Sequence, residues 1–232
     1  MEDLVSVVIP VFNEVGNILR VAWATCDALE DRCEFEIVFA NDGSLDTTAQ
    51  EIDRAQEVLG ERVRNVDLPV RSGQAAAMLA GIEAARGNTI VTVDGDCQDN
   101  PEDIMPLLGT YREHDNPQLL VCGGDVLVVR GISRLWHSGK VTGRSGLMVF
   151  DRETFLALPH LDNLDRLLPE IYRAFGHPVA TCPVHRQPRY SGVSKQILSR
   201  AASLVLDRFA IRRVAAHLIN AVNSEKKNKG RG

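Results

Sequence analysis

The sequence predicts an α/β fold built on a mostly parallel sheet with helices on both faces. Through the first half of the 232 residues, short β-branched runs alternate with stretches of helical periodicity. This alternation is typical of parallel strands joined by crossover helices. Polar clusters follow three of the strand-like runs, and in such sheets ligands bind beyond the carboxyl ends of the strands.

Patterns of period two and period 3.6 place the individual elements along the chain. Strands are expected at residues 4–12, 35–40, 63–67, 88–94, 147–150 and 179–184. Helices are expected at residues 17–30, 47–59, 74–86, 152–158, 162–175 and 196–220, and another begins at Pro101. Gly87 follows the alanine-rich run and is a natural helix stop. The stretch 123–146 is expected to form long loops around a strand or a short helix.

Composition indicates an ordinary soluble globular protein. Charged residues make up 25% and apolar residues 44% of the chain, which suits one large domain or a domain with an appendage. The five cysteines are scattered without CxxC spacing, so we expect reduced thiols in a cytoplasmic protein. The acidic N-terminus shows no signal peptide, and no apolar run approaches the roughly 18–20 residues that span a bilayer.

Charge is distributed unevenly along the chain. From Thr181 onward there are 11 Lys and Arg residues against two acids, whereas the preceding 180 residues carry 15 bases and 29 acids. A basic C-terminal part on an acidic body favours an anionic partner such as a phosphate, a lipid headgroup or a nucleic acid. A solvated tail explains the basic residues within 226–231 but not the arginines upstream.

An acidic motif follows the strand expected at residues 88–94. Asp94 and Asp96 stand one residue apart, and the amide of Gln98 comes two residues later. Oxygen ligands in this arrangement hold Mg²⁺ or Mn²⁺ together with the phosphate oxygens of a substrate. The alternative is an acidic turn that caps the helix beginning at Pro101. The motif alone leaves both interpretations open.

Three further clusters lie at strand ends or helix starts, and each has a purely structural alternative. Residues 10–14 could grip a nucleobase or form an ordinary strand-to-helix turn. Residues 41–44 could place a carboxylate on a base or ribose, or form only a capped turn. Residues 71–74 place a cation at a helix N-terminus. This segment could bind a phosphate, or it could serve only as ordinary helix capping.

Two basic clusters occur in the second half. The loop 185–195 contains two arginines, a glycine and a Ser-Lys pair, and could close over a pyrophosphate; a solvated loop is the alternative. Arg130, Arg134, Lys140 and Arg144 form the second cluster. A phosphate-bearing acceptor and surface solubility are both open interpretations of it.

Taken in order, these pieces resemble the GT-A-fold inverting glycosyltransferases of family two. The closest likeness is to the dolichol-phosphate mannose synthase and polyprenyl-phosphate glycosyltransferase branch. The motifs are Val8-Ile-Pro-Val-Phe-Asn-Glu14, Asn41-Asp-Gly-Ser-Leu-Asp46, Arg71-Ser-Gly-Gln74, Asp94-Gly-Asp-Cys-Gln-Asp99 with Pro101-Glu102, Arg166-Leu-Leu-Pro169 and Arg189-Tyr-Ser-Gly-Val-Ser-Lys195. The likeness covers about residues 4–195, and the ordered set is specific although each motif alone is weak.

The resemblance implies roles for the residues of these motifs. The nucleotide sugar would be bound by Pro10, Phe12, Glu14, Asp42, Arg71, Gln74, Asp94 and Ser194. Asp96 and Gln98 would hold Mg²⁺ or Mn²⁺ against the diphosphate, and Asp96, Arg189 and Lys195 would serve catalysis. Arg130, Arg134 and Arg144 would meet the phosphate of a lipid acceptor.

The implied activity is inverting transfer of a sugar from a UDP- or GDP-linked donor to a polyprenyl phosphate. An ionised phosphate needs no general base, whereas a hydroxyl acceptor would need a positioned carboxylate, for which the sequence offers no clear candidate. We expect a glycosyltransferase domain at 1–195, an amphipathic helix at 196–222 for a membrane surface or subunit contact, and a disordered basic tail at 223–232. A cytoplasmic location, peripheral membrane attachment and self-association suit this layout, and no nucleic-acid partner is expected.

Some positions depart from the family pattern. Phe12 stands where tyrosine is usual, Asn41 stands where aspartate is common, and the segment between Leu119 and Gly146 is shorter than in relatives. The short segment keeps two alternatives open: a different acceptor, or a non-catalytic nucleotide-sugar-binding homologue. A phosphatase with a strand-borne Asp-x-Asp pair is less favoured, because Gln98 stands where it has threonine or valine.

Overall fold

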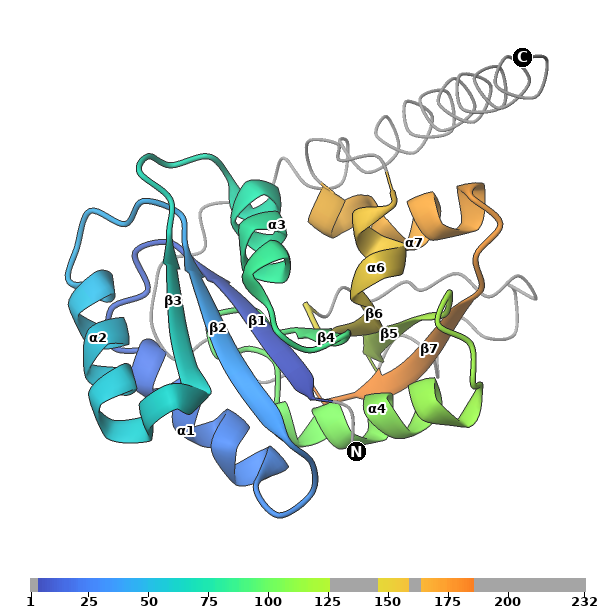
Figure 1. Cartoon of the computed structure of the whole chain (residues 1–232), viewed down its shortest axis with the longest axis horizontal. Helices are drawn as coiled ribbons and strands as arrows, with labels where there is room; N and C mark the ends of the chain where they lie inside the picture. Colours follow the sequence, from blue (N-terminus) through green and yellow to red (C-terminus); the bar gives the residue numbers. More distant parts are fainter. Residues whose placement is uncertain (1–3, 126–145, 159–163, 186–232) are drawn as a thin grey trace.

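The computed structural model describes residues 4–125, 146–158 and 164–185 (Figure 1). Within these residues seven strands form one sheet in the order β3-β2-β1-β4-β6-β5-β7. The strands are β1 (Val5–Val11), β2 (Phe35–Asn41), β3 (Val63–Asp67), β4 (Thr89–Thr92), β5 (Leu120–Asp125), β6 (Met148–Asp151) and β7 (Val179–Val184).

The sheet is mostly parallel, as the sequence predicts. Strands β1 to β4 all run in one direction, and β1 lies centrally between β2 and β4. Strand β6 is antiparallel to both of its neighbours, β4 and β5, while β7 is parallel to β5. Six strands therefore share one carboxyl edge, and this edge carries the loops that follow β1, β2, β3, β4, β5 and β7.

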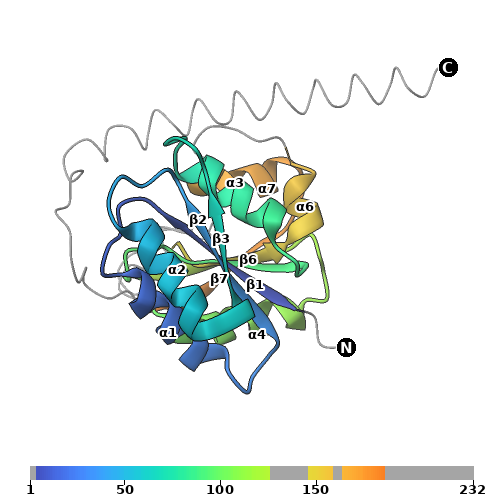
Figure 2. The same ribbon diagram turned by 60° about the vertical axis from the view of Figure 1, so that its left-hand side comes forward.

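Helices cover both faces of this sheet (Figure 2). One face carries α1 (Ile18–Leu29), α2 (Thr48–Leu59) and α4 (Ile104–Glu113), and the other carries α3 (Gln74–Ala84), α6 (Arg152–Leu156) and α7 (Leu164–Ala174). Two short 3-10 helices, η1 (Gly60–Arg62) and η2 (Pro101–Asp103), precede β3 and α4.

Alternation along β1 builds two separate cores. Val7 and Ile9 belong to the cluster beneath α1, α2 and α4, whereas Val8 between them belongs to the cluster beneath α3 and α7. Successive strand side chains point to opposite faces, so a strand buried on both sides shows a continuous apolar run instead of alternation. This is why the run at residues 5–11 is so uniformly buried.

A buried carboxylate joins the amino ends of the central strands. Glu36 in β2 is only 3% exposed, and its Oε1 accepts hydrogen bonds from the Ser6 hydroxyl (2.7 Å) and the Arg86 backbone N–H (2.6 Å). The Ser6 hydroxyl in turn accepts from the Gly87 N–H (2.9 Å), and the Arg64 guanidinium lies 3.4 Å from Glu36 Oε2. This network fixes the turn between α3 and β4 at the edge opposite the polar loops.

The element limits differ from the expected ones mostly by one or two residues, and β3 and β7 match them. The strand β5 was not anticipated, because its glycines at 123 and 124 hide the strand pattern. The helix expected at 196–220 and the basic tail lie outside the described residues, as does most of the 123–146 stretch. Among the residues described, none belongs to a helix that is long and apolar enough to cross a membrane.

Candidate functional site

The loops after β1 and β2 are tied together by side-chain contacts. Asn13 adopts a left-handed conformation with φ of 53°, which asparagine tolerates better than most residues. Its backbone N–H donates to the Ser44 hydroxyl (3.0 Å), and its Oδ1 accepts from the Leu45 N–H (2.9 Å). These bonds fix the spacing between residues 10–14 and residues 41–44.

Glu14 is held at the same junction. Its backbone N–H donates to the Thr48 hydroxyl at the start of α2 (2.9 Å), and its Oε2 accepts from the Asn17 side-chain amide (2.7 Å). The side chain is half-buried, so its carboxylate borders the site without being fully exposed to solvent. This placement is compatible with the predicted contact to a nucleobase.

Asp42 is more deeply built into the protein than the sequence suggests. It is 3% exposed; its Oδ1 accepts from the backbone N–H groups of Ser72 (2.6 Å) and Gly73 (3.0 Å), and its Oδ2 also accepts from Gly73 (2.9 Å). The carboxylate therefore anchors the loop that leads into α3. Its predicted contact with a base or ribose stays a prediction, and this anchoring is a structural role that the sequence did not reveal.

Arg71 lies on the aromatic ring of Phe12. The guanidinium carbon of Arg71 is 4.2 Å from the ring centre, a close cation–π contact. The approach depends on Gly43, because a Cβ at this position would lie 2.7 Å from the Arg71 backbone nitrogen. The sequence left open whether residues 71–74 lie beside a phosphate or form ordinary capping. The structure places Arg71 against Phe12, the aromatic residue predicted to contact the base.

The carboxylate of Asp94 is enclosed from two sides. The side-chain nitrogen of Gln74 donates to Asp94 Oδ1 (3.2 Å) from the first turn of α3. A Cβ at Gly146 would lie 2.3 Å from the Asp94 carboxyl carbon, so any larger residue there would have to displace the Asp94 carboxylate. The Thr92 hydroxyl donates to the Gly146 carbonyl (2.6 Å) and fixes that backbone in place.

The loop after β4 presents the two remaining members of the acidic motif. Asp96 and Gln98 are half-buried, and Asp96 Oδ1 accepts from the Gln98 backbone N–H (3.1 Å). Cys97 between them has φ of 57°, and burial raises the pKa of its thiol. The buried Asp99 closes the loop, because its Oδ2 accepts from the Asp94 N–H (3.1 Å).

The donor set suits a cation that a substrate helps to bind. Asp96 and Gln98 offer carboxylate and amide oxygens, the ligand types that Mg²⁺ and Mn²⁺ prefer. In the part of the chain that the structure describes, no group of three or more His, Cys, Asp or Glu side chains is arranged to hold a metal ion. A cation at this loop would therefore need further oxygens from a diphosphate and from water, as is usual for Mg²⁺.

The loops after β1, β2, β3 and β4 lie at one edge of the sheet, and these loops with the end of β1 and the start of α3 carry the described site residues (Figure 1). They are Pro10, Phe12, Glu14, Asp42, Arg71, Gln74, Asp94, Asp96 and Gln98. The remaining predicted members lie outside the described residues. These are the acceptor arginines Arg130, Arg134 and Arg144 and the loop residues Arg189, Ser194 and Lys195.

Sequence reasoning missed several residues that shape this site. Asp99 lies inside the acidic motif, but the motif does not show that its side chain closes the loop. No pattern in the neighbouring sequence marks Thr92 or Gly146 as part of the site. In the sequence Asp103 is only another acidic residue after Pro101, yet it accepts a hydrogen bond from the His185 backbone N–H and contacts the imidazole ring, 82 positions away. A contact over such a distance in sequence leaves no local pattern.

The sheet is mostly parallel with helices on both faces, and its carboxyl edge carries Phe12 and the Asp94-x-Asp96 loop. This arrangement is that of a GT-A nucleotide-sugar transferase domain. The model of the family "Glycosyl transferase family 2" matches residues 6–154. The chain belongs to glycosyl transferase family 2 and is a nucleotide-sugar glycosyltransferase.

Solved structures of glucosyl-3-phosphoglycerate synthase from Mycobacterium tuberculosis share the fold. The complex with phosphoglyceric acid has a TM-score of 0.61 at 22% identity, covering 82% of this chain and 73% of that one. The complex with Mn²⁺, UDP and phosphoglyceric acid has a TM-score of 0.62 at 21% identity, covering 94% and 78%. The complex with Mg²⁺ and UDP has a TM-score of 0.59 at 21% identity, covering 82% and 73%.

Proposed function

We propose that the protein transfers a sugar, with inversion, from a UDP- or GDP-linked donor in a reaction that depends on Mg²⁺ or Mn²⁺. One observation carries this proposal. The loops after β1, β2, β3 and β4 lie at one edge of the sheet; the loop after β1 carries the aromatic ring of Phe12, and the loop after β4 carries the oxygen atoms of Asp96 and Gln98. Similar folds hold Mg²⁺ with UDP, or Mn²⁺ with UDP-glucose, which supports the donor class.

The described residues divide the binding of the donor among them. Phe12 and Arg71 offer a flat, cationic surface for the base, and Asp42 keeps the Arg71 loop in position. Asp94, which is oriented by Gln74, would face the ribose of the donor. The predicted contribution of Arg189, Ser194 and Lys195 is to neutralise the departing diphosphate.

Asp96 and Gln98 would hold the metal ion, which neutralises negative charge on the diphosphate when bound. The Gln98 backbone N–H donates to Asp96 Oδ1, and this hydrogen bond keeps the Asp96 carboxylate folded over the short segment that also carries Gln98. The leaving nucleoside diphosphate takes the electron pair of the bond to the anomeric carbon. The chain's own task is to present oxygens to the metal ion and to keep the donor aligned.

For the acceptor we propose a polyprenyl phosphate, on the strength of the motif resemblance. Arg130, Arg134 and Arg144 would bind its phosphate, and the anion would attack the anomeric carbon without a general base. Residues 196–222 would lie on the cytoplasmic surface of the membrane or join subunits. The phosphoglyceric acid in the similar structures favours a second candidate, a phosphorylated hydroxy acid.

The metal and donor assignment is tested by nucleotide binding. We expect UDP or GDP to bind in the presence of Mn²⁺, and Asp96→Asn to weaken that binding by at least about tenfold, since charge-assisted ligation at a metal site is lost. Asp53→Asn on the exposed surface of α2 is the matched control. Equal affinities for the wild type and Asp96→Asn would overturn the metal assignment.

The acceptor is tested by product analysis with purified full-length protein. Radiolabelled UDP-glucose and GDP-mannose are each supplied with undecaprenyl phosphate, dolichyl phosphate or 3-phosphoglycerate. A lipid-extractable product supports the polyprenyl acceptor, and a water-soluble phosphorylated product supports the second candidate. Co-sedimentation with anionic liposomes, with and without residues 196–232, tests the membrane role of that segment; equal binding by both forms would contradict it.

A further inference from the structure

Asp103 and His185 form a buried-carboxylate and exposed-imidazole pair. Asp103, in η2, has a side chain only 8% exposed, whereas the side chain of His185 is 76% exposed. The His185 backbone N–H donates to Asp103 Oδ2 (2.7 Å), and the imidazole Nδ1 lies 3.2 Å from Asp103 Oδ1. One carboxylate therefore fixes both the main chain and the ring of this histidine.

This contact determines which ring nitrogen carries the proton. A carboxylate oxygen only accepts hydrogen bonds, so Nδ1 of His185 carries a proton in both the neutral and the charged ring. In the neutral ring Nε2 is then the basic nitrogen, and the ring's high exposure leaves it open to solvent. An imidazole oriented by a carboxylate in this way is equipped to accept a proton from a hydroxyl group.

The pair also lies at the edge of the sheet that carries the site. His185 directly follows β7, which is parallel to β5 and ends at the same edge as β4. Asp103 is only four residues beyond Asp99, which closes the Asp94 loop. Strands β7 and β4 are three strand spacings apart, about 14 Å, which places the imidazole on the side of the site away from the base.

We propose that His185 is the general base for a hydroxyl-bearing acceptor and that Asp103 is its positioning residue. The inference rests on the proposed donor chemistry and adds an acceptor class to it. The acceptor oxygen forms the bond to the anomeric carbon while its proton passes to Nε2. The bond between that carbon and the diphosphate oxygen breaks, and its electron pair leaves with the nucleoside diphosphate. Asp103 stabilises the resulting imidazolium, which releases its proton to solvent.

Asp103 is the charged partner that the η2–α4 side contributes to this imidazole. Cys182, on β7 itself, has a thiol whose pKa is raised by burial; a hydrogen bond with Thr110 of α4 opposes that rise, and the charge of Asp103 adds to it. Because the base acts only as neutral imidazole, the rate of hydroxyl transfer should rise with pH as the ring loses its proton.

The test measures three readouts on the full-length protein with Mn²⁺ and UDP-glucose or GDP-mannose as donor. The first is transfer to 3-phosphoglycerate, glycerate, glycerol or water, the second is transfer to undecaprenyl phosphate, and the third is calorimetric binding of UDP and GDP. For His185→Asn we expect a loss of about 10²-fold in hydroxyl transfer and a flat pH profile, because general bases contribute roughly 10²–10⁴-fold. The loss with undecaprenyl phosphate should be at least about tenfold smaller, because that acceptor is already ionised.

Asp103→Asn should lower hydroxyl transfer by at least about tenfold, because the amide no longer stabilises the imidazolium. His114→Gln is the matched control, since His114 is an exposed histidine whose Nδ1 contacts only the Thr110 carbonyl on its own helix. Failure of the wild type to bind either nucleotide would overturn the proposed function together with this inference. Intact nucleotide binding with no hydroxyl transfer, or with equal losses on both acceptor classes in His185→Asn, would overturn the inference alone.

Discussion

The side-chain nitrogen of Gln74 donates a 3.2 Å hydrogen bond to Oδ1 of Asp94, joining the start of α3 to the loop after β4. Twenty positions separate the two residues in sequence. The bond orients a carboxylate whose opposite side faces the Gly146 backbone. The carboxylate that is predicted to lie near a ribose is therefore in contact with Gln74 and close to Gly146 in the protein alone.

Removal of this bond should weaken donor binding. We expect Gln74→Ala to raise the dissociation constant for UDP or GDP in Mn²⁺ by about fivefold, because a net hydrogen bond contributes about 1 kcal/mol. Titration calorimetry measures the change, and Gln118→Ala in an exposed turn is the control. Identical affinities for Gln74→Ala and the wild type would show that Asp94 needs no orientation by Gln74.

The anchoring of the Ser72–Gly73 backbone predicts a combined effect on stability and binding. Asp42→Asn replaces one carboxylate oxygen by an NH₂ group, which faces a backbone N–H that also donates. We expect the free energy of unfolding to fall by about 1.5–3 kcal/mol, which is the range for hydrogen bonds to charged groups. We also expect weaker nucleotide binding. Urea denaturation measures the first effect, with Asp53→Asn as control; an unchanged unfolding midpoint would contradict the anchoring role.

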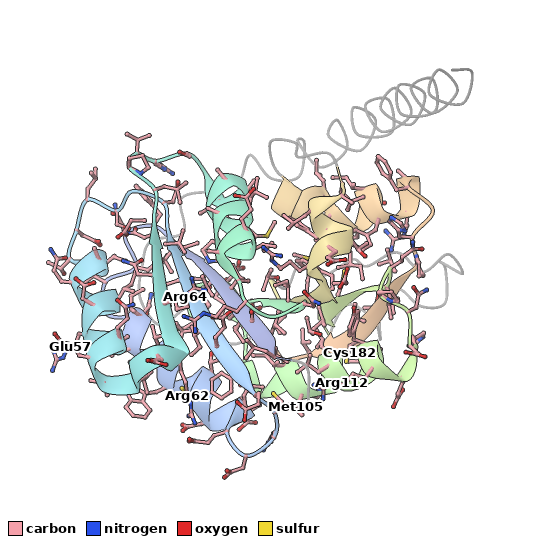
Figure 3. The ribbon with its side chains drawn as sticks, viewed as in Figure 1. Glu57, Arg62, Arg64, Met105, Arg112 and Cys182 are labelled. Atoms are coloured by element: carbon pink, nitrogen blue, oxygen red, sulfur yellow. The ribbon has the colours of Figure 1, made fainter. Side chains whose placement is uncertain are left out.

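The contact between Arg71 and Phe12 has a matched counterpart elsewhere in the protein. Arg62 lies over the Phe35 ring at 5.4 Å, near the amino end of β3 and away from the site (Figure 3). We expect Arg71→Ala to weaken nucleotide binding about threefold to fivefold, since an exposed cation–π contact contributes about 0.5–1 kcal/mol. Arg62→Ala should leave the affinity unchanged. Similar losses in both variants would mean that Arg71 acts only through general charge.

The buried Glu36 predicts a large effect on stability at the opposite edge of the sheet. Glu36→Ala removes the acceptor of both the Ser6 hydroxyl and the Arg86 N–H. Leaving two such donors without this partner should cost about 2–4 kcal/mol of unfolding free energy. Denaturant titration measures it, and Glu57→Ala on the exposed face of α2 is the control (Figure 3). If Glu36→Ala lowered the free energy of unfolding no more than Glu57→Ala does, the role of Glu36 in this network would be contradicted.

The thiol of Cys122 predicts a pH effect. Burial raises its pKa from 9.0 to about 12, so at pH 8 the folded protein holds almost no thiolate at this position. Iodoacetamide should therefore leave Cys122 unmodified until urea unfolds the chain, as peptide mass spectrometry would show. Because the folded pKa is raised, this group's contribution to stability is complete below pH 9 and falls as pH rises towards 12. Rapid labelling of folded Cys122 at pH 8 would contradict the burial.

The sequence predicted most elements because their patterns are local. The apolar run of β1 and the cap-and-stop signals around α3 each depend on neighbouring residues, so their limits were predicted to within a few positions. Strand β5 was missed because Gly123 and Gly124 have no side chains to show a period, and pairing with β6 and β7 makes the segment a strand. The antiparallel direction of β6 is likewise a property of the whole sheet.

In the candidate site, too, local patterns predicted some features and only the tertiary structure showed others. The residue types and spacing of Asp94, Asp96 and Gln98 indicate oxygen ligands at a strand end whatever the surroundings, and the ordered motifs predicted the family. Family membership and the GT-A fold are confirmed. The polyprenyl acceptor, the membrane role of residues 196–222 and the roles of the loop arginines stay predictions.

The sequence by itself determined the class of fold and the family, and it predicted the edge of the sheet for ligands and the residues for donor chemistry, because each depends on short-range pattern and residue type. Only the tertiary structure showed that Asp42 anchors the Arg71 loop, that Gly146 leaves room for the Asp94 carboxylate, and that Asp103 holds His185. These contacts join residues 30 or more positions apart. Packing of the whole chain around one sheet creates them, so no local pattern in the sequence records them.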